Sequence, residues 1–233
     1  MIGRKAFLGL ATALALVVSV PAWAGWNASG GEKEAALKLK GDPNRGRMIY
    51  EVCSACHMPE GWGLEDGTFP QIAGQHPSVL VKQLADIRAE NRDVPTMYPF
   101  AIPSEIGGPQ SIADVAAYIA RLPMNPVNGM GPGKDLAHGE MVYKKNCVRC
   151  HGQNGEGIAK DFFPAIYGQH YRYVLRQMEW IRDGNRRNAN PDMVRQIRRF
   201  SQRDLEAVSD YVSRLRPHAP KLATPGWRNP DFD

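Results

Sequence analysis

Two copies of the pentapeptide Cys-x-x-Cys-His, at residues 53–57 and 147–151, use all four cysteines of the 233-residue chain. Two thiols three positions apart can add to the two vinyl groups of one porphyrin, and the adjacent histidine can bind its iron. This spacing is that of covalent haem attachment. The sequence therefore predicts two haem c groups, attached through Cys53, Cys56, Cys147 and Cys150, with His57 and His151 as axial iron ligands.

Haem iron changes its oxidation state by one electron, so electron transfer is the first function to consider. Four cysteines in two pairs could instead bind one zinc ion. That site would require the pairs to meet across 90 intervening residues, and it would leave both histidines unexplained. A thioredoxin-like dithiol would need a strand-helix-strand context, and the sequence shows none.

The chain repeats itself. A shift of 94 residues carries the first motif onto the second, and it carries residues 69–76 onto 163–170. Three prolines and three glycines in residues 123–133 interrupt any helix and mark the seam between the repeats. The length suits two domains of about 100 residues each. We predict domains at residues 25–126 and 127–233, the second with a C-terminal tail.

Each repeat is predicted to be all-α. Apolar residues recur at helical spacing in residues 112–122 and 205–215, and a further pair of helices is expected at 79–88 and 173–182. No alternating strand pattern is evident. Capping-box starts are expected for the closing helices, from Ser111 with Asp114 and from Ser201 with Asp204.

Residues 1–24 have the pattern of a secretory signal peptide. Arg4 and Lys5 give a positive start, residues 6–20 are apolar, and a small-x-small pattern ends at Ala24. A membrane anchor is the competing interpretation, but the apolar run is shorter than the roughly 20 residues of a spanning helix. We expect cleavage after Ala24 and a periplasmic mature protein, which agrees with haem attachment outside the cytoplasm.

These motifs resemble class I cytochrome c domains, and their tandem arrangement is similar to the dihaem cytochrome c4 family. The resemblance implies that the first and last helices of each domain cross closely, at Gly46 with Tyr118 and at Gly139 with Tyr211. It also implies a role for Pro70 and Pro164, whose carbonyl groups would accept a hydrogen bond from the axial histidines and fix them.

The resemblance implies methionine as the sixth iron ligand. Met97 and Met193 are the only methionines between the middle and closing helices, 41 and 43 residues after the second cysteine of their motifs. Methionines also fill gaps in cores, so packing is the alternative interpretation. His76 and His170 remain competing ligands, or they face a haem edge or cap the middle helices.

Two features depart from the family pattern. Met58 follows the first motif where glycine is usual and where the second repeat has Gly152. We therefore expect the first haem loop to differ in shape. The tail at residues 221–233 extends beyond the last helix, and we expect it to pack across the other domain.

Charge is divided unevenly along the chain. Residues 25–126 carry 9 basic and 12 acidic side chains, whereas residues 127–233 carry 18 and 12. A basic second domain can steer an acidic redox partner, neutralise haem propionates or touch anionic lipid, and an ordinary solvated face is the alternative. Nucleic-acid binding is not expected. The following arginines crowd the sequence around Met193, and we expect them to form a basic surface patch near the exposed edge of the second haem: Arg182, Arg186, Arg187, Arg195, Arg198 and Arg199.

The predicted function is single-electron transfer by a periplasmic dihaem cytochrome. Histidine and methionine on both irons would leave no open site for peroxide or oxygen. Expected partners are redox proteins: a quinol-oxidising complex, a terminal oxidase or a periplasmic dehydrogenase, with peripheral membrane association possible. The alternatives are the haem subunit of a larger oxidoreductase, such as a flavocytochrome sulfide dehydrogenase, and a dihaem peroxidase-like enzyme.

Overall fold

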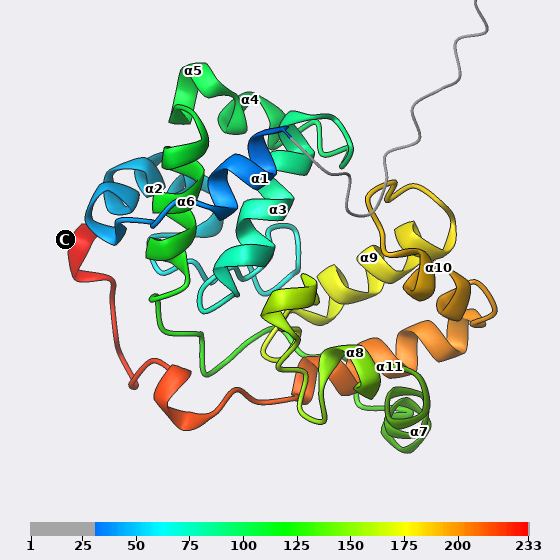
Figure 1. The fold of residues 1–233 in the computed structure, drawn as a ribbon. Coiled ribbons are helices and arrows are strands. Elements are labelled where there is room, and N and C mark those ends of the chain that lie inside the picture. The colour runs from blue at the N-terminus through cyan, green and yellow to red at the C-terminus, as the bar shows by residue number, and fades with distance from the viewer. Residues whose placement is uncertain (1–30, 233) are drawn as a thin grey trace, which may run out of the picture.

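The computed structural model describes residues 31–232, which form two helical modules side by side (Figure 1). No strand forms within this range, where the only β-type pairings are two isolated bridges. The predicted all-α class is confirmed. The predicted signal peptide lies outside the described residues. The first module contains α1 (Gly31–Leu37), α2 (Pro43–His57), α3 (Pro77–Arg88), α4 (Tyr98–Ala101), α5 (Pro103–Ile106) and α6 (Pro109–Ile119).

The second module repeats this plan with its first helix divided in two. Its elements are α7 (Leu136–Asn146), α8 (Val148–His151), η1 (Ala159–Asp161), α9 (Tyr171–Arg182), α10 (Pro191–Ile197) and α11 (Gln202–Arg214). The tail that follows contains the short turns η2 (Ala219–Lys221) and η3 (Pro230–Phe232) and returns to the first module, so that the C-terminus lies beside α2 (Figure 1).

The first and last helices of each module cross at a glycine. A Cβ atom added to Gly46 would lie 2.1 Å from the backbone oxygen of Asp114 and 2.8 Å from the Cβ of Tyr118. At Gly139 the added atom would lie 2.1 Å from a backbone oxygen of α11 and 3.0 Å from the Cβ of Tyr211. Only glycine permits such an approach. The crossing that the family resemblance implied is therefore present in both modules.

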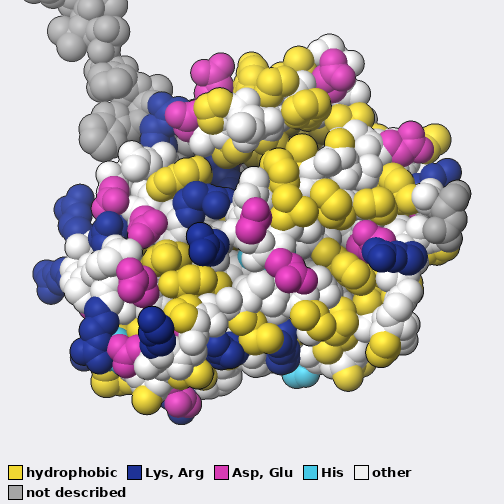
Figure 2. Space-filling model, turned by 180° about the vertical axis from the view of Figure 1, so that it is seen from behind, with side chains coloured by type: hydrophobic (Ala, Val, Ile, Leu, Met, Phe, Trp, Pro, Cys, Tyr) yellow, Lys and Arg dark blue, Asp and Glu magenta, His cyan; other side chains and the backbone are white. Residues whose placement is uncertain are grey.

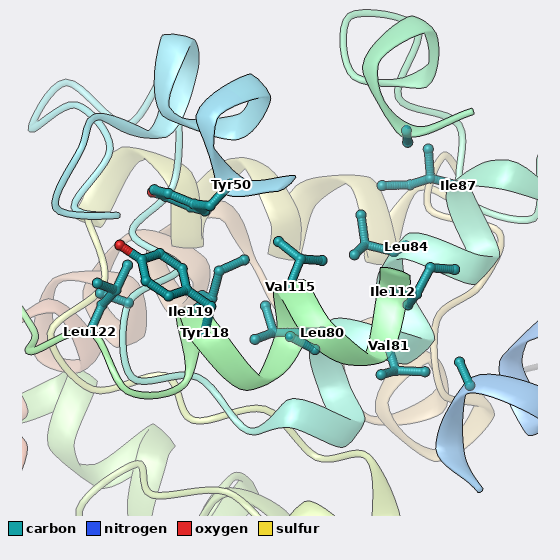
Figure 3. Packing of buried hydrophobic residues seen from close by; sticks show 14 residues of the cluster. Tyr50, Leu80, Val81, Leu84, Ile87, Ile112, Val115, Tyr118, Ile119 and Leu122 are labelled. Atoms are coloured by element: carbon teal, nitrogen blue, oxygen red, sulfur yellow. The ribbon is translucent and has the colours of Figure 1, made fainter. Parts of the chain in front are cut away.

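A separate apolar core lies under each crossing. In the first module, side chains from α3 and α6 interdigitate beneath Tyr50 of α2, and Ile112 and Val115 are completely buried (Figure 3). In the second module the corresponding core is built from α7, α9 and α11.

The middle helices α3 and α9 each begin two residues before the predicted start. In α3 this is because Pro77 occupies the first turn, where proline is favourable.

The two closing helices begin differently. Ser201 and Asp204 form the predicted capping box at the start of α11. The capping box predicted at Ser111 and Asp114 is wrong, because α6 begins earlier, at Pro109. Asp114 is instead buried in the helix crossing, where its carboxylate accepts hydrogen bonds from the backbone N–H of Asp42 and from the side chains of Arg45 and Gln110.

Candidate haem sites and the interface between them

The four cysteines lie in pairs, each at the end of a module's first helical segment. Cys53 and Cys56 are three residues apart in α2, which places them on one helical face. Cys147 follows α7 directly and Cys150 lies in α8. All four are half-buried and unpaired, so no disulfide competes for them. Burial raises the pKa of the Cys53 and Cys147 thiols to about 12.

Each motif histidine is buried and held through one ring nitrogen. His57 Nδ1 lies 2.9 Å from the Pro70 carbonyl oxygen, and His151 Nδ1 lies 3.1 Å from the Pro164 oxygen. Because a carbonyl only accepts, Nδ1 must carry the proton, and Nε2 of the neutral ring is left to bind metal. Burial lowers the pKa of both histidines, which favours this neutral form.

The loops that follow the two motifs have the same shape. Tyr50 donates a hydrogen bond to the Met58 carbonyl, and Tyr143 donates one to the Gly152 carbonyl, both at 2.8 Å. Met58 adopts φ +65°, close to the φ of +79° at Gly152. The expectation that Met58 changes the loop is therefore wrong. Methionine accepts a backbone conformation that suits glycine, and this stores strain in the first module.

Both candidate sixth ligands lie between the middle and closing helices, Met193 within a short helix and Met97 directly before one. Met97 immediately precedes α4 and packs partly buried against the core of the first module. Met193 is the third residue of α10 and is also partly buried. Asn190 fixes the start of α10, since its side chain accepts a hydrogen bond from the N–H of Asp192. The segments are matched in position but differ in local structure.

His76 and His170 bind the backbone of the opposite module. His76 Nε2 lies 2.8 Å from the Glu156 carbonyl oxygen, and His170 Nε2 lies 2.7 Å from that of Trp62. His170 also accepts from the Gly129 N–H through Nδ1, so both of its ring nitrogens are engaged. Neither side chain caps its helix. These histidines are interface residues, which makes them poor candidates for iron ligands.

Two glutamines next to these histidines make reciprocal contacts across the interface. Gln169 binds both backbone groups of Gln71, and Gln75 binds both backbone groups of Ala165. Because residues 71 and 75 correspond to 165 and 169 in the repeat, the contacts obey an approximate twofold symmetry. Figure 1 shows the modules meeting along α3, α9 and the loops before them.

A second symmetric cluster lies nearby. Arg92 donates to Gln83 and to the Tyr173 hydroxyl, while Arg186 donates to Gln177 and to Gln83. Burial, together with the charge of Arg92, lowers the pKa of Arg186 to about 10. Arg186 therefore belongs to the interface, and its assignment to a surface patch of arginines is corrected.

The remaining arginines of that predicted patch have different environments. Arg182 and Arg195 are each paired with an aspartate of their own segment, and Arg187 reaches the Glu90 carbonyl of the first module. Arg198 and Arg199 are exposed, and their side chains make no ion pair with any of residues 31–232. Lys and Arg side chains gather over the half of the surface formed by the second module (Figure 2).

The C-terminal tail packs against the first module, as predicted. The ring centroids of Trp227 and Trp62 lie 5.8 Å apart with the rings tilted by 43°, and Phe232 meets Tyr50 edge-on with ring centroids 5.9 Å apart. The buried Asn229 donates to the Pro59 carbonyl, just after the first haem motif. The tail thus reinforces the first haem loop, and the second module has no counterpart among the described residues.

The donor sets fit two haem c groups. Each contains two unpaired thiols and one histidine with its Nε2 available. A zinc site shared by the two motifs is not formed, since residues 31–232 contain no cluster of three or more metal-binding side chains. Within the same range, no helix is long and apolar enough to cross a membrane. Two helical modules that each present such a site define a two-haem electron-transfer protein.

Comparisons with known proteins agree with this class. The cytochrome c family model matches residues 43–123 and 136–216, so the chain belongs to the cytochrome c family, as a tandem cytochrome of the c4 type. Cytochrome c4 of Pseudomonas aeruginosa is 33% identical over 185 residues, covering 75% of this chain and 89% of that protein. The chain is accordingly an electron carrier with two haem c groups.

Two further matches extend the comparison. The crystal structure of reduced recombinant cytochrome c4 from Pseudomonas stutzeri superimposes with a TM-score of 0.67 at 29% identity, covering 76% of this chain and all of that one. A thiosulfate dehydrogenase electron acceptor of Stutzerimonas stutzeri is 29% identical over 217 residues, covering 88% of this chain and 94% of that protein.

Sequence reasoning missed the role of the interface. Gln75, Gln169 and their neighbouring histidines were visible as a repeated Gly-Gln-His segment. A polar segment retained in both halves of a tandem repeat is a signal for pseudo-symmetric contact, and it could have suggested an interface.

Proposed function

We propose that the protein carries single electrons in the periplasm, with His57 and Met97 binding one haem iron and His151 and Met193 the other. The supporting observation is the repeated site: two Nδ1-anchored histidines with free Nε2 atoms, each accompanied by one partly buried methionine at a matched position. Haem iron supplies one-electron chemistry, and methionine ligation raises its reduction potential.

The chain's own residues prepare each site for rapid electron exchange. The Pro70 and Pro164 carbonyls hold the imidazole rings in one orientation, and burial excludes water from them. A rigid, filled coordination shell changes little between oxidation states. It also leaves no position for peroxide, which separates this function from that of a dihaem peroxidase.

The ligand assignment is tested by the ferric visible spectrum of the haem-loaded protein. Methionine sulfur bound to ferric haem gives a weak far-red band. We expect the wild type to show the intensity of two haems, and Met97→Ala and Met193→Ala to lose half each. Met48→Ala and Met141→Ala are matched controls, because these exposed methionines occupy equivalent positions in α2 and α7. Full intensity in either ligand variant would contradict the assignment.

Export is part of the proposal. The predicted signal ends at Ala24, so the mature protein should begin at Gly25. Intact-mass analysis of protein from the periplasmic fraction, after expression with haem-maturation machinery, would show the mass of residues 25–233 plus two haems. A mass that retains residues 1–24 would instead support a membrane anchor.

The residues of this chain specify its physiological partners less closely than they specify its haem sites. A quinol-oxidising complex and a terminal oxidase are the donor and acceptor that we propose first. A second candidate donor is a thiosulfate dehydrogenase, because a relative that matches 88% of this chain is the electron acceptor of such an enzyme. Reduction of the oxidised protein by thiosulfate, only when a thiosulfate dehydrogenase is present, would favour the second candidate over the first.

Arg198 and Arg199 are the proposed docking residues for an acidic partner. They are exposed, lack ion pairs within residues 31–232, and directly follow the helix that carries Met193. Electrostatic steering weakens as salt increases. We expect Arg198→Ala with Arg199→Ala to slow reduction by the true partner at low salt and to reduce the salt dependence. Arg121→Ala, an exposed charge on the first module, is the control and should change neither.

A further inference from the structure

Gln75 and Gln169 form a reciprocal pair, here called the glutamine clamp. The Gln169 Oε1 accepts a hydrogen bond from the Gln71 N–H at 3.0 Å, and its Nε2 donates to the Gln71 carbonyl at 2.8 Å. The Gln75 Oε1 accepts from the Ala165 N–H at 3.0 Å, and its Nε2 donates to the Ala165 carbonyl at 2.8 Å. Each side chain therefore crosses the interface and fixes one residue of the other module.

The residue that each glutamine fixes directly follows an axial-histidine proline. The peptide group between Pro70 and Gln71 accepts from His57 Nδ1 at its carbonyl end, and its N–H end donates to Gln169. The peptide group between residues 164 and 165 is bonded in the same way to His151 and to Gln75. One peptide group thus joins each axial histidine to a side chain of the opposite module.

A peptide group that donates at its N–H end becomes a better acceptor at its carbonyl end, since hydrogen bonds in a chain polarise one another. A stronger acceptor for Nδ1–H makes the imidazole more basic toward iron. Greater basicity favours the ferric state, which lowers the reduction potential.

We propose that the glutamine clamp sets the two reduction potentials crosswise: Gln169 of the second module tunes the haem bound by His57, and Gln75 of the first module tunes the haem bound by His151. Both glutamines are positioning residues that act through the proline peptides. This inference rests on the proposed histidine ligation. It also couples assembly to function, because the potentials take their final values only when the modules are docked.

The orientation of each glutamine side chain is fixed within its own module as well. The Gln75 Oε1 also accepts from the His76 N–H at 3.0 Å, and the Gln169 Oε1 accepts from the His170 N–H at the same distance. An amide oxygen that receives two N–H donors cannot exchange places with its NH2 group without losing both. The polarising oxygen is therefore held against the proline peptide.

The test uses the full-length, haem-loaded protein with Gln169→Leu and Gln75→Leu. Leucine retains much of the volume but removes the acceptor. Potentiometric titration gives the two midpoint potentials, and NMR contacts of the haem methyl protons assign each to its module. We expect Gln169→Leu to raise the potential of the His57 haem alone and Gln75→Leu to raise that of the His151 haem alone. In the reduced protein, the Nδ1 proton of the same histidine should shift upfield.

Ser78→Ala is the matched control, because Ser78 also donates across the interface, to the Ala159 carbonyl at 2.6 Å, but does not touch a proline peptide. It should leave both potentials and both Nδ1 protons unchanged. The inference would be overturned if the potentials did not move, if both moved together in each variant, or if Ser78→Ala had the same effect. Wild-type protein that lacked two histidine-ligated haems would instead overturn the proposed function.

Discussion

The two modules share one plan at the haem motif and differ in what surrounds it. In both, a glycine permits the closing helix to cross the first helix, a tyrosine hydroxyl holds the loop carbonyl, and a proline carbonyl holds the motif histidine. Only the first module receives the C-terminal tail, and only the first has a non-glycine residue with positive φ directly after its motif. The common parts are those that the haem chemistry requires, whereas the surroundings are free to diverge.

The divergence gives the modules different surfaces. The tail covers the first haem loop with Trp227, Asn229 and Phe232, while the second module carries the surplus positive charge. From this difference in charge we propose that redox partners dock on the basic second module and that electrons cross the interface between the two modules.

Removal of the tail should produce the largest difference between the modules. A chain ending at Thr224 loses the aromatic contacts of Trp227 and Phe232 and the hydrogen bonds of Asn229. We expect the free energy of unfolding of the first module to fall by about 3–5 kcal/mol, because the loss of two half-buried aromatic side chains and of the buried Asn229 is comparable to the deletion of one core aromatic group. Hydrogen exchange resolved by peptide should show faster exchange in α2 and α6 and unchanged exchange in α9 and α11. Equal loss of protection in both modules would contradict the contrast.

Substitution of the crossing glycines should affect the two modules equally. Gly46→Ala and Gly139→Ala each place a methyl group 2.1 Å from a backbone oxygen, which cannot move without separating the helices. Overpacking of this kind lowers the free energy of unfolding by about 1–3 kcal/mol or more. Chemical denaturation should show a similar decrease in the free energy of unfolding for the two variants. Gly108→Ala is the control, because an added Cβ there meets no atom within 4 Å.

Met58→Gly should stabilise the first module. The residue has φ +65°, and relief of such backbone strain should raise the free energy of unfolding by about 1–2 kcal/mol. The reverse change, Gly152→Met, should destabilise the second module, since it introduces the same strain there and an added Cβ would meet the Glu156 carboxylate. Thermal unfolding monitored separately for each haem measures both effects. A lower unfolding temperature for Met58→Gly would show that the methionine side chain contributes more than its backbone costs.

The smallest expected effect is a pH dependence of the interface. Burial lowers the pKa of His170 below that of an exposed histidine, which is about 6.5. The unfolded chain therefore takes up a proton before the folded one does, and the stability contributed by neutral His170 is lost as the pH falls below about 6.5. The free energy of unfolding should decline over this range in the wild type and less steeply in His170→Asn. An identical slope in both proteins would assign the pH dependence to other groups.

The sequence predicted those parts of the molecule that a local pattern specifies. The haem motifs, the middle helices and the capping box at Ser201 each depend on residues close together in the chain, and the repeat is the recurrence of such local patterns after 94 residues. The capping box at Ser111 failed because Pro109 starts the helix earlier and because Asp114 is needed at the crossing with α2. A contact 72 residues away outweighed the local preference.

The interface could not be predicted in the same way. His76 and His170 have the residue type of an iron ligand, and their spacing does not reveal that each binds a carbonyl group of the other module. Arg186 likewise belonged to a basic stretch by sequence, but it lies half-buried between the modules and donates hydrogen bonds to Gln177 and Gln83. Both outcomes depend on how the two folded domains dock. Docking is determined by the complementarity of their surfaces and cannot be deduced from local sequence patterns.

The most direct test of the account is the binding of carbon monoxide to the reduced, haem-loaded protein. If histidine and methionine occupy both axial positions in both modules, carbon monoxide should leave the spectrum of both haems unchanged. Binding at one or both haems would show an open or easily displaced ligand and would contradict the assignment of the protein as a pure electron carrier.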